Sequence, residues 1–269
     1  MKSSAPTLTH VIPSQDRGSV TAVTSLGDDV FVVRWRSQQV EVYDARTFAL
    51  QRHITVPGLG VGSWGLAACA HYKCLYVSDS AHHSVHRARQ SGSSPEKQWS
   101  VARGPTGLSV NTAHNVVVAC SEANMIQEYT RHGTPVREIP LGSPWHAIQL
   151  STGHYVVSQR KSLGLVSVVG VGGQIVSSYR PSQTSGVREL NHERSLSVTK
   201  KGDIIVADTC NNRILSMNSS LSSAQQLTLP VDDGIQKPFC LCLDESRGRL
   251  YVSEFGGSCR VLVFDCVRL

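Results

Sequence analysis

An internal repeat is the feature of this sequence that most limits the folds open to it. Six short β-rich cores recur along the chain. Their third residues are Val32, Val77, Val118, Val157, Val206 and Val252. The spacings between these valines are 45, 41, 39, 49 and 46 residues and average 44, so that six units fill the 269 residues. Apolar runs of about four residues, bounded by turn residues, are typical of strands buried on both faces.

Each core lies in a longer unit that has room for three more strands. In the third unit, the core at 116–119 follows a strand-like segment at 106–109 and precedes two others at 125–129 and 136–139. No stretch of ten residues keeps the spacing of an amphipathic helix. Four short strands per 40–45 residues describe a propeller blade. We therefore predict an all-β fold, a six-bladed β-propeller of four-stranded antiparallel blades.

The ends of the chain predict how the ring closes. The sixth unit stops after its third strand, at 267–269. The N-terminal segment 8–13, LTHVIP, resembles the fourth strand of the first unit at 53–57, HITVP. We expect it to complete the last blade, because closure leaves no long open sheet edge. The prediction is one domain over residues 1–269, without linkers and monomeric.

Composition and the termini point to a cytoplasmic protein. Residues 1–13 lack the apolar core of a secretory signal. The uncharged stretch 162–179 contains VGVGG, which favours a strand–turn–strand hairpin over a membrane span. The eight cysteines show no C-x-x-C spacing and indicate buried thiols in a reducing compartment. A bridge between Cys69 and Cys74 across a hairpin is the alternative for that pair.

The fifth unit contains a recognisable motif. Residues 201–214 read KGDIIVADTCNNRI, which resembles the NHL repeat with its DGxIxVADxxNxRI run. Units two and six are looser copies, and Arg34, Cys120 and Gln159 replace the expected aspartate in the other three. The chain thus resembles the C-terminal propeller of TRIM-NHL proteins. That resemblance implies a recognition module for single-stranded RNA, or for protein substrates of a ubiquitin ligase.

The polar residues of this motif have a structural interpretation. Asp208 follows the second strand, where a carboxylate accepts N–H groups of the turn. Asn211 and Asn212 tolerate positive φ there, and Arg213 can pair with an acid. We expect these residues to stabilise the blade.

Motifs of enzymes and cofactor sites are weak. Residues 60–65, GVGSWG, match G-x-G-x-x-G, but only nine residues separate them from the next strand, so no nucleotide-binding helix fits. The histidines include His82, His83 and His86 but do not form a zinc-ligand pattern, and no G-x-S-x-G elbow is present. We predict a non-enzyme without cofactor or metal; a propeller lyase or hydrolase is the weaker alternative.

The net charge of +6 permits an anionic partner but does not require one. In a propeller, loops between strands two and three share one face with the connections between blades. Arginines there offer forks for phosphate, and aromatic rings offer stacking surfaces for bases. The alternative for each aromatic is a core plug of the channel mouth. The predicted RNA-binding residues are Arg34, Arg36, Trp64, His82, His83, Arg103, Trp145, His146, Arg160, Lys161, Arg188, Arg194, Lys237 and Phe239.

Overall fold

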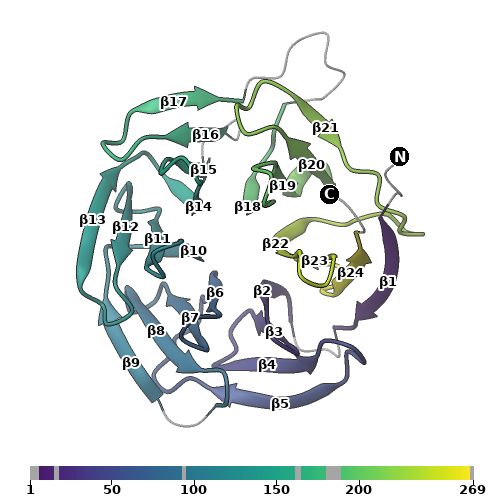
Figure 1. The fold of residues 1–269 in the computed structure, drawn as a ribbon. Coiled ribbons are helices and arrows are strands. Elements are labelled where there is room, and N and C mark those ends of the chain that lie inside the picture. The colour runs from purple at the N-terminus through teal and green to yellow at the C-terminus, as the bar shows by residue number, and fades with distance from the viewer. Residues whose placement is uncertain (1–5, 15–17, 93–94, 161–164, 180–188, 267–269) are drawn as a thin grey trace.

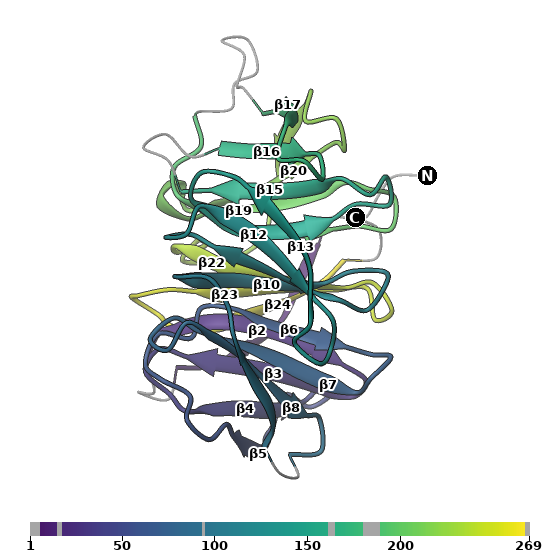
Figure 2. The same cartoon turned by 90° about the vertical axis from the view of Figure 1, so that its left-hand side faces the viewer.

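Six four-stranded antiparallel sheets form a closed ring in the computed structural model (Figure 1). The structure describes residues 6–14, 18–92, 95–160, 165–179 and 189–266. The predicted fold class is therefore confirmed. In an edge view the strands cross the thickness of the ring, so their connections lie on its two faces (Figure 2).

The strands follow the predicted units. Blade one contains β2 (Val20–Leu26), β3 (Asp29–Arg34), β4 (Gln39–Asp44) and β5 (Leu50–Thr55), and blade two contains β6 (Leu66–Cys69), β7 (Cys74–Asp79), β8 (Ser84–Arg89) and β9 (Pro95–Ser100). Blade three contains β10 (Pro105–Val110), β11 (Val116–Cys120), β12 (Met125–Tyr129) and β13 (Pro135–Pro140), and blade four contains β14 (Pro144–Gln149), β15 (Tyr155–Gln159), β16 (Leu165–Val169) and β17 (Ile175–Ser178). Blade five contains β18 (Glu193–Val198), β19 (Ile204–Asp208), the 3-10 turn η1 (Thr209–Asn211), β20 (Arg213–Met217) and β21 (Ala224–Gln226). Blade six contains β22 (Pro238–Asp244), β23 (Arg249–Glu254), β24 (Val261–Asp265) and β1 (Thr7–Ile12).

The hydrophobic core lies between neighbouring blades. Six clusters of buried side chains each join one blade to the next around the ring. Alternate residues of β3 face opposite neighbours: Phe31 packs with blade two, whereas Val30 and Val32 pack with blade six. Side chains of a strand alternate between its two faces, and both faces are covered here. This explains why the repeat cores are continuous apolar runs.

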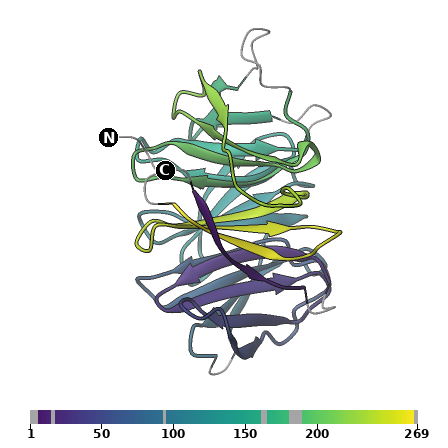
Figure 3. The same ribbon diagram turned by 90° about the vertical axis from the view of Figure 1, so that its right-hand side faces the viewer.

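The N-terminal strand closes the ring, as predicted. β1 pairs antiparallel with β24, with Leu8 opposite Phe264 and Val11 opposite Leu262. Figure 3 shows the purple N-terminal strand alongside the yellow C-terminal strands. Ile12 adds to the cluster between blades six and one. The last blade thus joins both ends of the chain.

The structure also bears on the segment 162–179 and on the cysteines. β16 and β17 form the hairpin predicted within 162–179, although 162–164 lie outside the described residues. Across the described part of the chain, no helix has the length and apolarity needed to cross a membrane. Cys69 and Cys74 face each other across the β6–β7 hairpin as free thiols. Four of the eight cysteines are buried, and Cys210 is exposed.

Candidate functional site

A buried polar pair links the second and third strands of blade five. Arg213 Nε donates to Asp208 Oδ2 at 2.7 Å, and both side chains are buried. The backbone N–H of Asn191, in the connection entering the blade, donates to Asp208 Oδ1 at 2.9 Å. Asn212 has a φ of 52°, which agrees with the turn predicted for it. The NHL-like motif therefore ties its blade to the connection before it.

Every blade carries such a pair, although the residue types change. The other pairs are Arg34 with Glu41, Asp79 with His86, Cys120 with Gln127, Gln159 with Ser167 and Glu254 with Arg260. One member of each pair also binds a backbone group of the entering connection, at Gly18, Gly60, Ala102, Gly142 and Gln236 respectively. The units that depart from the repeat motif thus keep its structural role with other side chains.

Arg34, one of the residues predicted to bind RNA, is enclosed by the fold. Its side chain is 1% exposed, and its Nε donates to Glu41 Oε2 at 2.9 Å. Its terminal nitrogens donate to the carbonyls of Pro13, Gly18 and Cys259. These four hydrogen bonds engage all three guanidinium nitrogens within the fold, so the role that the structure shows for Arg34 is structural.

Blade two gathers two imidazoles on one carboxylate. Asp79 Oδ2 lies 2.8 Å from His82 Nδ1 and 3.2 Å from His86 Nε2, and it accepts the N–H of Gly60. Burial alone would raise the pKa of Asp79, but the hydrogen bonds from His82 and Gly60 hold that pKa below its usual value. Burial lowers the pKa of His86 more than Asp79 raises it. Among the described residues, no three His, Cys, Asp or Glu side chains converge as a metal site.

The glycine-rich segment 60–65 allows blades to approach closely. A Cβ at Gly65 would overlap the carbonyl oxygen of Thr106 and lie 2.9 Å from the N of Leu108. A Cβ at Gly107, one blade further, would lie 2.6 Å from His146 Cδ2. These contacts agree with the prediction that the segment is a connection between blades.

His146, another residue predicted to contact RNA, is likewise enclosed by the fold. His146 is buried, its Nε2 lies 3.1 Å from the carbonyl oxygen of Leu108, and its Nδ1 accepts the N–H of Leu196 at 3.0 Å. The accepting Nδ1 fixes the neutral ring with its proton on Nε2. Burial lowers the pKa of His146 to about 4. The ring therefore joins the inner strands β10, β14 and β18 and is occupied on both nitrogens.

An aromatic cluster covers the mouth of the central channel. Trp64 lies at its centre, with ring-centroid distances of 4.5 Å to Trp35, 5.8 Å to Phe239 and 5.9 Å to Trp145. Phe255 stacks on Phe239 at 4.8 Å. We call these five residues the mouth cluster. Trp145 and Phe239 are buried, which agrees with the core-plug alternative for these two predicted RNA-binding residues, whereas Trp35, Trp64 and Phe255 are half-buried and keep exposed surface.

Neither Trp35 nor Phe255 is among the RNA-binding residues predicted from the sequence. Trp35 directly follows Arg34, and Phe255 directly follows Glu254. Both aromatics therefore follow the polar residue that ends the second strand of their blade. This common position in the repeat is the signal that would have identified them together.

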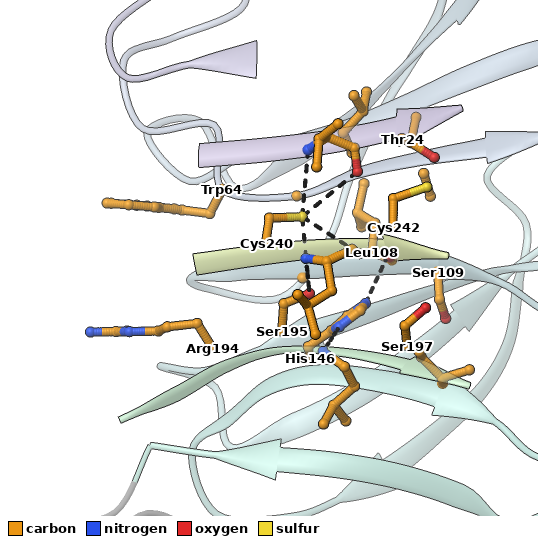
Figure 4. Close-up of a pocket in the computed structure, with 18 of the residues that line it drawn as sticks. Thr24, Trp64, Leu108, Ser109, His146, Arg194, Ser195, Ser197, Cys240 and Cys242 are labelled. Carbon is orange, nitrogen blue, oxygen red and sulfur yellow. Dashed lines mark hydrogen bonds between the residues drawn. The ribbon is translucent and has the colours of Figure 1, made fainter. Parts of the chain in front are cut away.

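Arginines border the mouth cluster. Arg194 stacks over Trp145 with its Cζ 4.1 Å from the ring centroid, and it lies 5.7 Å from the centroid of Phe239. The exposed Arg160 lies 6.0 Å from Trp145. Stacking of guanidinium on aromatic rings fixes the planar group and keeps donors at its edge. Figure 4 shows Arg194 and Trp64 at the same end of the channel.

The exposed charged side chains of this face carry both signs. Among the described loops, four exposed cations, Arg36, Arg103, Arg160 and Lys237, accompany four exposed acids, Glu122, Glu189, Asp232 and Asp233. Arg103 Nε lies 3.9 Å from Glu122 Oε2. His82 is exposed and His83 half-buried on the same face. Lys161 and Arg188 lie outside the described residues. The described side chains therefore give this face a mixed charge.

A cavity of about 200 Å³ lies in the channel below the mouth cluster (Figure 4). Its lining includes the hydroxyls of Thr24, Ser109 and Ser197 and the thiols of Cys240 and Cys242. Burial raises the pKa of Cys240, and it raises that of Cys242 to about 11. Both thiols are therefore protonated and weak nucleophiles at neutral pH. The chemistry available in the channel is hydrogen bonding to small polar groups.

Comparisons with known proteins agree with the repeat and the fold. The NHL repeat model matches residues 194–215, which run from β18 to β20. No curated protein matches the chain significantly. The chain is therefore a six-bladed β-propeller that carries an NHL repeat.

Solved propellers superpose over nearly the whole chain. Hydrazine synthase from Kuenenia stuttgartiensis is 15% identical, with a TM-score of 0.70 over 95% of this chain and 96% of that chain. Virginiamycin B lyase from Staphylococcus aureus is 11% identical, with a TM-score of 0.69 over 96% and 99%. The WD40 propeller domain of Doa1 is 13% identical, with a TM-score of 0.66 over 96% of both chains. At these identities the likeness shows the fold alone.

Proposed function

We propose that this protein is a non-enzymatic recognition module that binds single-stranded RNA at the mouth cluster. The observation that carries the proposal is the group of half-buried rings, Trp35, Trp64 and Phe255, at one channel end. Unpaired bases stack on such rings with little dependence on sequence. Arg160 and Arg194 beside the cluster supply donors for phosphate oxygens.

The mixed charge of this face shapes the expected binding. Few phosphates would be neutralised, so stacking would supply most of the affinity and the salt dependence would be shallow but present. A labelled single-stranded RNA of mixed sequence is titrated at 50 mM and 200 mM salt. Lack of detectable binding at 50 mM salt contradicts the proposal.

Two variants test the location of the RNA site. Trp64→Ala should weaken binding about tenfold or more, because one stacked base contributes about 1–3 kcal/mol. Arg160→Glu should weaken binding to all sequences alike and flatten the salt dependence. Phe48→Ala is the matched control, because Phe48 is a half-buried aromatic in the β4–β5 turn on the opposite face. Equal affinities of the Trp64 and Phe48 variants would exclude the mouth cluster as the site.

Protein recognition is the second candidate, and the balanced charges favour it. Among the residues that the structure describes, four exposed cations and four exposed acids around an aromatic centre match the polar rim and aromatic core of protein interfaces. Such a propeller would capture substrates for a ubiquitin ligase. Protein partners that are retained after nuclease treatment and lost in Trp64→Ala would support this candidate over RNA.

A further inference from the structure

A second cavity, of about 670 Å³, lies on the opposite face of the ring from the mouth cluster. Three successive blades contribute to it. Arg52 comes from β5 of blade one, Lys73 from the β6–β7 turn and Arg89 from the end of β8, and Arg131 comes from the β12–β13 turn of blade three. The volume falls within the range of about 300–1,000 Å³ typical of small-molecule sites.

Cationic side chains dominate the described lining of this cavity, which we call the basic cavity. The lining includes Arg52, Lys73, Arg87, Arg89 and Arg131, with Asp29 as the acidic member. Asp29 accepts from Arg52 Nη2 at 2.9 Å and from Gln90 Nε2 at 3.1 Å. The carboxylate is thus engaged at the edge formed by blade one, and the cations of blades two and three face the remaining volume.

The turn that carries Arg131 is held in place by other cations. Arg87 Nη1 donates to the carbonyl of Arg131 at 2.9 Å, and Lys97 Nζ donates to the carbonyl of His132 at 2.6 Å. Arg131 itself stacks over Tyr72 with its Cζ 4.3 Å from the ring centroid. Its Nε donates to His132 Nε2 at 2.8 Å. The guanidinium is therefore positioned before any ligand arrives, which lowers the entropic cost of binding.

The positive charges around the cavity also act on the imidazole of His132, next to Arg131. Partial desolvation, and after it the positive charges of Arg131, Arg87 and Lys97, lower the pKa of His132. Neutral His132 accepts from Arg131, so the pair keeps its geometry at neutral pH. A positive field of this kind favours any ligand that brings negative charge.

We propose that the basic cavity binds a small anion carrying two or more phosphate groups. Guanidinium groups match phosphate oxygens with paired N–H donors, and lysine adds a point charge. Cations from separate blades line a space larger than one phosphate, so a ligand with several phosphates engages more of them. This site is independent of RNA binding at the mouth cluster.

The test uses inorganic tripolyphosphate as the probe and isothermal titration calorimetry at 50 mM salt. We expect saturable binding to the full chain. The double variant Lys73→Glu/Arg131→Glu should bind at least about tenfold more weakly, because two charge-assisted contacts become repulsive. Absence of binding to the unchanged chain, or equal binding by the double variant, overturns the proposal.

Controls separate this site from a fold defect and from RNA binding. Lys73 is an exposed turn residue, so Lys73→Glu alone should keep the thermal midpoint and still weaken tripolyphosphate binding about threefold. Arg160→Glu changes the net charge equally on the opposite face and should leave tripolyphosphate binding within about twofold. An equal loss in Arg160→Glu would mean a diffuse charge effect and would reject the basic cavity.

A competition experiment identifies the source of the phosphates. Excess tripolyphosphate should leave RNA bound at the mouth cluster, and Trp64→Ala should leave tripolyphosphate affinity unchanged. If tripolyphosphate does not bind while RNA binding is lost in Lys73→Glu/Arg131→Glu, the cavity is part of an RNA path and the proposal of a small polyphosphate fails. These measurements therefore show separately whether the RNA proposal or the polyphosphate proposal fails.

Discussion

Arg34 and Glu41 form the blade-one counterpart of the Asp208–Arg213 pair, with the charges exchanged. The arginine ends the second strand and the acid lies on the third, whereas blade five has the acid first. Tyr43 also donates its hydroxyl to Glu41 Oε2 at 2.8 Å. Blade one therefore has an ion pair at the same buried position, with the positive and negative residues exchanged.

We predict that breaking this pair destabilises the protein strongly. Glu41→Gln leaves the buried Arg34 guanidinium without its counter-charge, and the expected loss in unfolding free energy is about 3–5 kcal/mol. The exposed pair between Arg103 and Glu122 provides the control, because Glu122→Gln should change stability by less than about 1 kcal/mol. Chemical denaturation of both variants gives the comparison, and similar losses in the two would contradict it.

The neutral His146 predicts acid sensitivity. Its pKa is about 4 in the folded protein and about 6.5 when unfolded. The unfolded chain therefore binds a proton first, so stability is complete above about pH 6.5 and falls as the pH decreases toward 4. The expected loss for this residue is about 3 kcal/mol.

Unfolding free energies of the unchanged chain and His146→Gln, measured from pH 7 to 4, test this. The slope against pH should be smaller in the variant, because glutamine does not titrate. Some slope should remain, since burial also lowers the pKa of His86. Identical slopes would show that His146 is protonated as readily in the folded state as in the unfolded chain.

Gly65→Ala should be among the most damaging small substitutions. The added Cβ would overlap the backbone of blade three at Thr106, and backbone atoms of a packed strand cannot move aside. We expect a loss of about 3 kcal/mol or more in unfolding free energy. Gly153→Ala is the matched control: its Cβ meets nothing within 4 Å, and only its φ of 84° causes strain, about 1 kcal/mol. Thermal midpoints that fall equally in both would contradict the close approach of blades two and three.

The sequence predicts the strands better than it predicts the surface. The six valine-centred cores are buried from both sides, so their apolar runs repeat regardless of ligand. Closure by the N-terminal strand was likewise visible, because 8–13 matches a fourth strand. These features follow from local pattern and period, which a sequence carries directly.

The surroundings of a polar side chain could not be predicted from the sequence where its partners come from distant residues. Arg34 looks like a surface cation until Glu41 and the carbonyls of 13, 18 and 259 surround it. His146 looks exposed until strands of blades three and five bind both of its nitrogens. The basic cavity could not be predicted for the same reason, because its cations come from three blades. The position of a charged residue within its repeat does not show which residues of other blades lie beside it.

The cysteines should differ sharply in reactivity. Cys210 is exposed in η1, whereas burial raises the pKa of Cys120 to about 12 and that of Cys266 to about 11. Thiolate is the reactive form, so the native protein should show a fast reaction of Cys210 with Ellman's reagent. Cys210→Ser should remove the fast phase, and denaturation of the unchanged protein should expose all eight thiols. A fast phase that persists at full amplitude in Cys210→Ser would contradict the assignment of the fast reaction to Cys210.

Removal of β1 should open the ring at blade six. Without residues 1–12, β24 becomes an edge strand with unpaired backbone groups, and the cluster between blades six and one loses Ile12. Exposed edges of this kind pair with other chains. We expect a lower thermal midpoint together with dimers or larger species in light scattering after size-exclusion chromatography. Removal of residues 1–5, which precede β1, should leave both measurements unchanged. A monomeric, equally stable protein without residues 1–12 would show that the ring does not depend on closure by its N-terminal strand.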